Sequence, residues 1–251
     1  MTVKSSDRTL EILERLASHG RRTLGELARE LGIPKSSLHG ILRTMADRGW
    51  VETDPSGTRF GLGLRALQVG AAYLEADDAV TLVGTLLDDL AAQFGETVHL
   101  GRLDGPYVVY MAKRESIHPL RLFSAIGRRL PAHATALGKA LLAEREDAEV
   151  AAILPAPLPR LTARTLVNPS ELYTELARIR ERGYAVDHEE NTDGIVCVAM
   201  AVPLRRPAVD AISLSIPISR LPDGVEPTLV EGLRRAVDQV RAARGLLAGS
   251  W

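Results

Sequence analysis

Cys197 is the single cysteine of the chain, and it follows Asp187 and His188 closely in the sequence. A thiol, an imidazole and a carboxylate are the groups of a cysteine nucleophile, in which the imidazole removes the thiol proton. No recognised nucleophile motif surrounds Cys197, and nothing in the sequence requires a His–Cys pair. We therefore expect no catalytic residue, and a small-molecule hydrolase that uses Cys197 is the alternative.

The histidines do not form a metal-binding pattern. His99, His118, His133 and His188 are scattered, without the spacing that brings imidazoles to one ion. Lone histidines are more often structural or solvated. The sequence therefore predicts no metal site and no cofactor, and His133 is expected to shape a turn.

Two serines lie in an apolar run near the C-terminal end. Ser213 and Ser215 share one face of the predicted strand 208–216, because side chains alternate along a strand, and its isoleucines and leucine take the other. In the predicted strand 195–203, Cys197 faces the same way as Ile195 and Ala199. Two serines on one face of a core strand indicate a polar pocket. The alternative is that they form hydrogen bonds only within the core.

A second set of polar residues lies on one side of a short helix that is expected to open at Pro34 and to end by Arg48. Leu38, Ile41, Leu42 and Met45 form its apolar side at helical spacing. A helix in the DNA major groove needs short donors and acceptors for base edges and cations for phosphates. The opposite side supplies Lys35, Ser36, Ser37, His39, Gly40 and Arg43. The alternative is an ordinary solvated helix pair.

The elements around this helix are those of a winged helix-turn-helix. Thr23 and Glu26 form a capping box before the preceding helix, Gly32 ends that helix, and Pro34 is expected to open the next. An earlier helix is expected to begin at Ser6 or Asp7 and to end at His19. Strands at 50–53 and 59–62 flank the turn 54–57, so the wing can bring Arg59 to the minor groove.

The rest of the chain predicts a linker and an α+β domain. Leu64, Leu67, Ala71 and Leu74 follow a coiled-coil spacing, which favours either dimerisation or packing on their own domain. Antiparallel strands flanked by helices are expected beyond residue 77. Strands are predicted at 97–103, 107–113, 120–124, 185–188, 195–203 and 208–216. Helices are predicted at 82–94, 149–154, 169–182 and from 229, and the segment 126–144 is predicted to be a loop that enters a helix of small residues.

Composition indicates an ordered, two-domain, cytoplasmic protein. The chain has 251 residues, 45% of them hydrophobic and 25% charged, with no signal-peptide core and no membrane-length apolar run. The net charge of −1 conceals an asymmetry, because residues 1–65 hold 11 basic and 8 acidic residues. The basic excess lies with the predicted DNA-binding domain.

Two C-terminal segments, GRRLPAHATALGKALLA and GYAVDHEENTDGIVCVAMAVP, are more specific than the helix-turn-helix. With AISLSIPISRL and the N-terminal ELARELGIPKSSLHGILRTM, they resemble the IclR-type transcriptional regulators over essentially the whole chain. The resemblance implies a winged helix-turn-helix at 1–63, a linker helix at 64–76 and a GAF-like effector-binding domain at 77–251. Many family members carry a large basic residue where this chain has Gly40, so we expect Gly40 to permit close approach of the backbone to DNA.

The resemblance also implies a ligand site and partners. Asp187, Cys197, Ser213 and Ser215 match the polar ligand positions of the family, Ala136 and Leu137 match positions whose amides meet the ligand, and Leu122 with Pro119 matches the apolar wall. The partners implied are double-stranded operator DNA, a small-molecule effector and a second copy, as a homodimer or a dimer of dimers. The sequence thus predicts a regulator, more often a repressor, controlled by a hydroxy or keto acid. A polyol is the alternative, because HGILRT resembles the glycerol-operon regulators.

Overall fold

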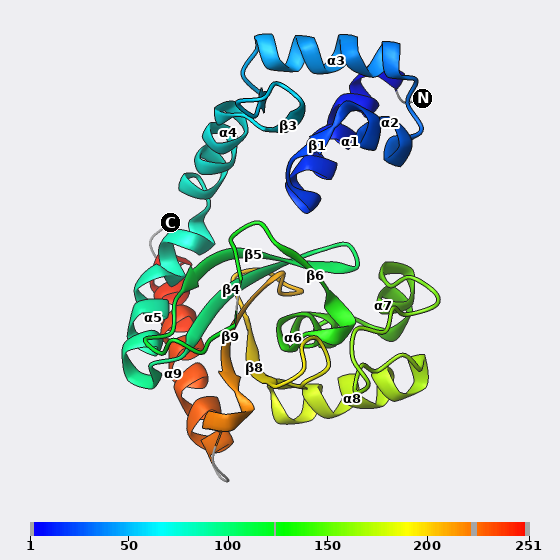
Figure 1. Ribbon diagram of the computed structural model, residues 1–251. Helices are drawn as coiled ribbons and strands as arrows, with labels where there is room; N and C mark the ends of the chain where they lie inside the picture. Colours follow the sequence, from blue (N-terminus) through cyan, green and yellow to red (C-terminus); the bar gives the residue numbers. More distant parts are fainter. Residues whose placement is uncertain (1–2, 123, 222–224, 249–251) are drawn as a thin grey trace. The chain divides into compact units, whose positions relative to one another are not determined.

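The computed structural model describes residues 3–122, 124–221 and 225–248 (Figure 1). The chain divides into two compact units, residues 1–76 and 77–251, and each is considered by itself. None of the described helices is long and apolar enough to cross a membrane.

The first unit is a three-helix core with a small sheet. Helices α1 (Lys4–His19), α2 (Leu24–Leu31) and α3 (Lys35–Asp47) pack around fully buried aliphatic side chains, among them Ile12, Leu27 and Leu38. Strands β1 (Arg22–Thr23), β2 (Val51–Thr53) and β3 (Arg59–Leu62) pair in the order β1-β3-β2. Helix α4 (Leu64–Glu75) follows. This is the predicted winged helix-turn-helix.

Local signals set the ends of α2 as predicted. The Glu26 amide donates to the Thr23 hydroxyl at 3.2 Å, and the Thr23 amide donates to the Glu26 carboxylate at 2.7 Å, which completes the capping box. Gly32 ends α2 at a φ of 63°, a left-handed conformation that glycine adopts without steric cost.

Three details of the first unit differ from prediction. Helix α1 begins at Lys4 rather than at Ser6 or Asp7, because the Asp7 amide already donates to the Val3 carbonyl as part of the first turn. Pro34 has an extended backbone and precedes α3 instead of opening it. Strand β1 was not predicted, since only its pairing with Arg59 and Phe60 of the wing makes these two residues a strand.

The second unit is built on one antiparallel sheet of six strands in the order β6-β5-β4-β9-β8-β7. Their bounds are β4 Thr97–Asp104, β5 Tyr107–Arg114, β6 Arg129–Pro131, β7 Ala185–His188, β8 Ile195–Val202 and β9 Asp210–Pro217. The central strands β4 and β9 come from distant parts of the sequence, and Thr97 pairs with Ser215.

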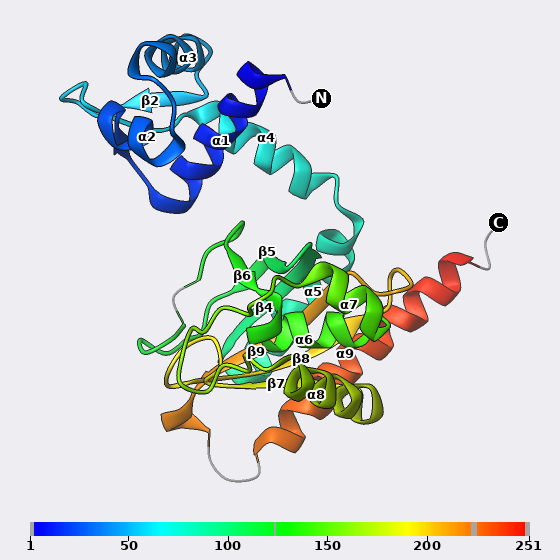
Figure 2. The same cartoon turned by 90° about the vertical axis from the view of Figure 1, so that its right-hand side faces the viewer.

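Helices cover both faces of this sheet (Figures 1 and 2). Helices α5 (Asp78–Phe94) and α9 (Val225–Ala248) contact one face, and α6 (Ala136–Ala143) contacts the other. Helix α8 (Pro169–Arg182) packs on α6. Helix α7 (Asp147–Ile153) follows α6 in the chain. The predicted Asn168 cap of α8 is confirmed, with the Ser170 amide donating to the Asn168 side chain at 3.0 Å.

The strand predicted at 120–124 is wrong for residues 120–122 and 124, and residue 123 lies outside the described residues. The Ser116 hydroxyl donates to the Gly95 carbonyl at 2.7 Å and accepts the His118 amide at 3.2 Å, so the chain turns away after β5. The partner of β5 at this edge is β6 instead, where Val108 pairs with Leu130.

Candidate functional site

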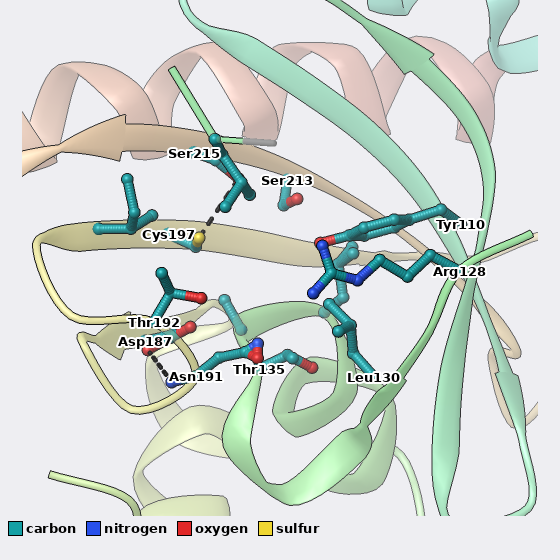
Figure 3. Close-up of a pocket in the computed structure, with 14 residues that line it drawn as sticks. Tyr110, Arg128, Leu130, Thr135, Asp187, Asn191, Thr192, Cys197, Ser213 and Ser215 are labelled. Carbon is teal, nitrogen blue, oxygen red and sulfur yellow. Dashed lines mark hydrogen bonds between the residues drawn. The ribbon is translucent and has the colours of Figure 1, made fainter. Parts of the chain in front are cut away.

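The predicted ligand residues converge on one cavity in the second unit (Figure 3). Its atom-free space is about 450 Å³, part of which is open to solvent. All seven residues predicted for the ligand site line it: Leu122, Ala136, Leu137, Asp187, Cys197, Ser213 and Ser215. Pro119 is not among the lining residues.

Strand register brings three of the polar residues together. Cys197 on β8 pairs with Ser215 on β9 on one side and with Asp187 on β7 on the other. The Cys197 thiol donates to the Ser215 hydroxyl at 3.2 Å. Ser213 is buried, lines the same cavity, and its hydroxyl has no hydrogen-bond partner among the described residues. The alternation predicted for β9 therefore holds, and the serines face the cavity.

The first turn of α6 forms another wall. The Thr135 hydroxyl caps the helix by accepting the Gly138 amide at 3.0 Å. A Cβ on Gly138 would lie 2.1 Å from the Ala132 carbonyl oxygen, and a Cβ on Gly101 would lie 2.8 Å from a Leu137 methyl carbon. Gly138 lets α6 pack against the turn at Ala132, and Gly101 lets Leu137 of α6 approach the sheet. Ala136 and Leu137, in the first turn of α6, line the cavity.

Asp187 is the buried acid of the cavity. Its side chain accepts the Glu190 amide at 2.6 Å, a bond that favours the charged carboxylate. Burial outweighs that bond and, together with the nearby charge of Glu190, raises the pKa of Asp187 to about 7. Near neutral pH this carboxyl can therefore either donate or accept a hydrogen bond.

Cys197 does not have the environment of a nucleophile. Burial, followed by the charge of Asp187, raises the pKa of the thiol, whereas a reactive cysteine needs a lowered pKa. His188 is exposed and lies next to the buried Asp187 on β7, where neighbouring side chains point to opposite faces. The hydrolase alternative therefore lacks its base.

Several cavity residues were missed by the sequence reading. Arg128 and Tyr110 bring a guanidinium and a phenol to the wall, and both point toward the cavity in Figure 3. Tyr110 stacks on the buried His99 with ring centroids 4.2 Å apart. The remaining lining residues are Leu130, Thr135, Asn191, Thr192 and Ile195. All of these cavity residues except Tyr110 lie in the two matched segments, 127–143 and 183–203, and that position was the signal that could have found them.

The predicted nucleic-acid face is largely exposed on α3. Lys35, Ser36, His39, Gly40 and Arg43 are exposed. Ser37 is half-buried, and its hydroxyl accepts Nη1 of Arg8 on α1 at 3.3 Å. Ser37 therefore has a structural contact within its own unit, which sets it apart from the other predicted DNA contacts.

The wing is stiffened by one aspartate. Asp54 Oδ1 accepts the amides of Thr58 and Arg59, each at 3.0 Å, which holds the turn between β2 and β3. The Arg59 guanidinium donates to the Arg21 carbonyl at 3.4 Å and remains exposed. An exposed cation on a fixed hairpin suits contact with a phosphate or the minor groove.

Comparison with known proteins matches each of the two units to a domain of the same family. Residues 5–55 match the IclR helix-turn-helix domain, and residues 71–242 match the C-terminal domain of bacterial transcriptional regulator IclR. The regulator XynR of Escherichia coli K12 is 35% identical over 237 residues, which span 93% of this chain and 94% of that protein. The glycerol operon regulatory protein of Streptomyces coelicolor is 36% identical over an alignment of 253 positions, with 98% of each chain covered.

A solved structure has the same fold over almost the whole chain. The crystal structure of an IclR transcriptional regulator from Alicyclobacillus acidocaldarius has a TM-score of 0.85 at 26% identity, covering 96% of this chain and 99% of that one. A winged helix-turn-helix followed by this α+β unit defines a DNA-binding transcriptional regulator. The chain belongs to the IclR family of bacterial transcriptional regulators. The relatives are named as regulators, so the protein is a regulator rather than an enzyme.

Proposed function

We propose that this regulator is a repressor whose operator affinity is controlled by a small hydroxy or keto acid bound in the cavity. The observation that carries the proposal is the convergence of Asp187, Ser213 and Ser215 with the first turn of α6 in one cavity of small-molecule size. Relatives named as repressors, including IclR of Escherichia coli at 35% identity, support the direction of control.

The charges of the cavity favour an acid over a neutral ligand. The α6 amides and the Arg128 guanidinium suit a carboxylate, and protonated Asp187 does not repel one. The free Ser213 hydroxyl and the Asp187 carboxyl can bond a hydroxyl or keto oxygen. A polyol is the second candidate, and the likeness to the glycerol operon regulatory protein favours it.

We infer that the protein acts as a dimer on a palindromic operator in the cytoplasm. Helix α4 buries none of its residues within this chain, and Leu64 and Leu67 are both more than 60% exposed. Exposed leucines at coiled-coil spacing are best covered by a second copy. A dimer would present two α3 helices, and a two-fold operator matches such a pair.

Thermal-shift measurements on the purified protein test the effector assignment. A panel of small hydroxy acids, keto acids and glycerol should contain an acid that raises the melting temperature, because a ligand that binds only the folded state stabilises it. The same acid should not stabilise Asp187→Ala or the double variant Ser213→Ala with Ser215→Ala. Arg178→Ala, an exposed change on α8, is the control and should respond as the parent does.

Two results would overturn parts of the proposal. Glycerol as the sole hit would replace the acid by a polyol. A hit that stabilises the Asp187 and double-serine variants as much as the parent would show that the effector binds elsewhere. The DNA-binding part is tested separately, since a duplex from the protein's own promoter should bind with an affinity that falls steeply with salt.

A further inference from the structure

Lys139 is a buried cation that is not among the residues lining the cavity. It lies on α6, one turn after Ala136, and is 1% exposed. Its Nζ forms an ion pair with Glu190, whose side chain is 9% exposed. Lysine is almost never buried to this degree without a partner. Removing both charges from water costs free energy, so the pair needs an explanation beyond simple stabilisation.

Glu190 belongs to the loop 189–194 that connects β7 to β8 and supplies Asn191 and Thr192 to the cavity. Its carbonyl accepts the hydroxyls of Thr165 at 2.7 Å and Thr162 at 3.2 Å. Its amide is the donor to Asp187 at 2.6 Å. One residue therefore joins the loop, the buried acid and, through Lys139, the helix that forms the opposite wall.

The arrangement is held at an energetic cost. Oε2 of Glu190 is buried and has no hydrogen-bond partner among the described residues. Glu189, just before it, has a φ of 62°, and within the described part of the chain it is the only residue other than glycine with a positive φ. Buried ion pairs add little net stability over apolar side chains of similar size. A stability role alone does not account for these features.

We propose that the buried Lys139–Glu190 ion pair is the positioning device of the cavity, tying loop 189–194 to α6 and aiming the Asp187 carboxyl at the hydroxyl or keto oxygen of a bound acid. Lys139 and Glu190 are positioning residues, because neither lines the cavity. The inference rests on the proposed function for the identity of the ligand, but the placement of the loop is testable without any ligand.

The test is the double variant Lys139→Met with Glu190→Leu. Replacing both partners by apolar side chains of similar size leaves no unpaired buried charge, so the fold should be retained. The matched control is Arg241→Met with Asp238→Leu, which removes an exposed ion pair on α9 whose atoms are 2.8 Å apart. Urea unfolding of parent, variant and control gives the global stability of each.

The single cysteine reports the loop directly. Cys197 lines the cavity and is only partly buried, so the rate at which a bulky aromatic disulfide such as dithionitrobenzoate reacts with its thiol reports how far the loop opens. In the double variant the reaction should be about tenfold faster or more, the effect of roughly 1.4 kcal/mol of lost local stability. The faster rate should be insensitive to low urea concentrations, which marks local opening. A rate equal to that of the parent, or one that follows global unfolding, overturns the proposal.

Selectivity provides the second readout, using lactate and propionate, which differ by one hydroxyl. In the parent, lactate should bind more tightly because the positioned Asp187 meets its hydroxyl. In the double variant that preference should be lost, whereas a merely structural pair would weaken both acids equally and leave their ratio unchanged. If neither acid binds the parent, the comparison is repeated with the hydroxy acid of the panel that raises the melting temperature and its analogue without the hydroxyl. If no acid of the panel binds, the acid assignment fails, and the cysteine measurement alone decides whether the pair positions the loop.

Discussion

At the scale of single residues, Asp187 makes the stability of the second unit depend on pH. Burial, and then the charge of Glu190, raises its pKa from 3.8 to about 7. The folded protein therefore holds a proton that the unfolded chain releases at lower pH. The stability associated with this proton is complete below pH 3.8 and is lost as pH rises through about 7. The neutral, buried His99 has the opposite dependence, because burial lowers its pKa to about 3.

Replacing Asp187 by asparagine should remove the pH dependence of stability that comes from Asp187 and leave the one that comes from His99. Asparagine keeps an oxygen that can accept the Glu190 amide and cannot ionise. Relative to the parent, Asp187→Asn should gain roughly 2 to 3 kcal/mol of unfolding free energy between pH 5 and pH 8, about 1.4 kcal/mol for each pH unit below the folded pKa. Urea unfolding at the two pH values measures it. A difference that does not change with pH would show that Asp187 is ionised throughout.

At the scale of elements, helix α3 contains a glycine that its own fold does not require. A Cβ at Gly40 would have no heavy atom within 4 Å, and Gly40 lies between the exposed His39 and the half-buried Ile41. An interior helical glycine costs about 1 kcal/mol relative to alanine. We propose that Gly40 serves close approach of the helix to DNA.

Gly40→Ala should therefore stabilise the protein by up to about 1 kcal/mol while weakening operator binding about tenfold. Gly84→Ala in α5 is the control, since its added Cβ would meet only the Arg114 side chain at 4.0 Å, in the other unit. Melting temperatures and duplex titrations separate the two effects. Unchanged or tighter operator binding by Gly40→Ala would mean that the backbone at this position stays clear of the DNA.

Two exposed arginines of the first unit, Arg43 and Arg59, should have different effects on DNA recognition. Arg43 is exposed on α3, whereas Arg59 begins β3 directly after the turn of the wing. Arg43→Ala should cost about 1 to 3 kcal/mol and relax the preference for one base pair, and Arg59→Ala should reduce the salt slope by about 1 with little change in preference. Titrations of singly substituted operator duplexes at several salt concentrations measure both. Losses independent of sequence for both variants would show that Arg43 reads no base.

The elements whose signals are local were the ones predictable from the sequence. Caps at Thr23, Gly32, Asn168 and Gly183 and the alternation of Ser213 and Ser215 depend on residues within one or two turns, and the structure confirms them. The two-residue strand β1 and the absence of strand at 120–122 depend on pairing with distant residues, which no local pattern encodes.

The cavity was predictable only in part, because some of its residues follow local patterns and others depend on pairing between distant strands. Its seven predicted residues were located by resemblance, and the face of β9 was located by period. Arg128 and Tyr110 reach the cavity through the pairing of β5 with β6 and the shift in register at Gly101. The Lys139–Glu190 pair joins residues 51 positions apart. Such contacts follow from the tertiary fold, so neither spacing nor composition could indicate them.

At the scale of the whole molecule, control by an effector requires that cavity and operator influence each other across residues 76 and 77. Asp77 caps α5 at the start of the second unit, and Arg102 on β4 binds both Asp77 and Asp210. Asp210 begins β9, the strand that carries Ser213 and Ser215. The first residue of the second unit is thus linked, through Arg102, to the strand that carries Ser213 and Ser215.

Coupling between two sites is reciprocal, which gives a prediction for the intact protein. If an acid weakens operator binding by some factor, the operator must weaken binding of that acid by the same factor, typically about 5-fold to 150-fold. Calorimetric titration of the acid with and without a saturating operator duplex, compared with operator titrations with and without the acid, measures both factors. Ser213→Ala with Ser215→Ala should abolish the response to the acid and leave operator affinity unchanged in its absence, because both serines lie in the unit that does not contain α3. Equal acid affinities with and without operator would mean that the cavity does not control DNA binding, and a retained response in the double-serine variant would mean that the controlling ligand binds elsewhere.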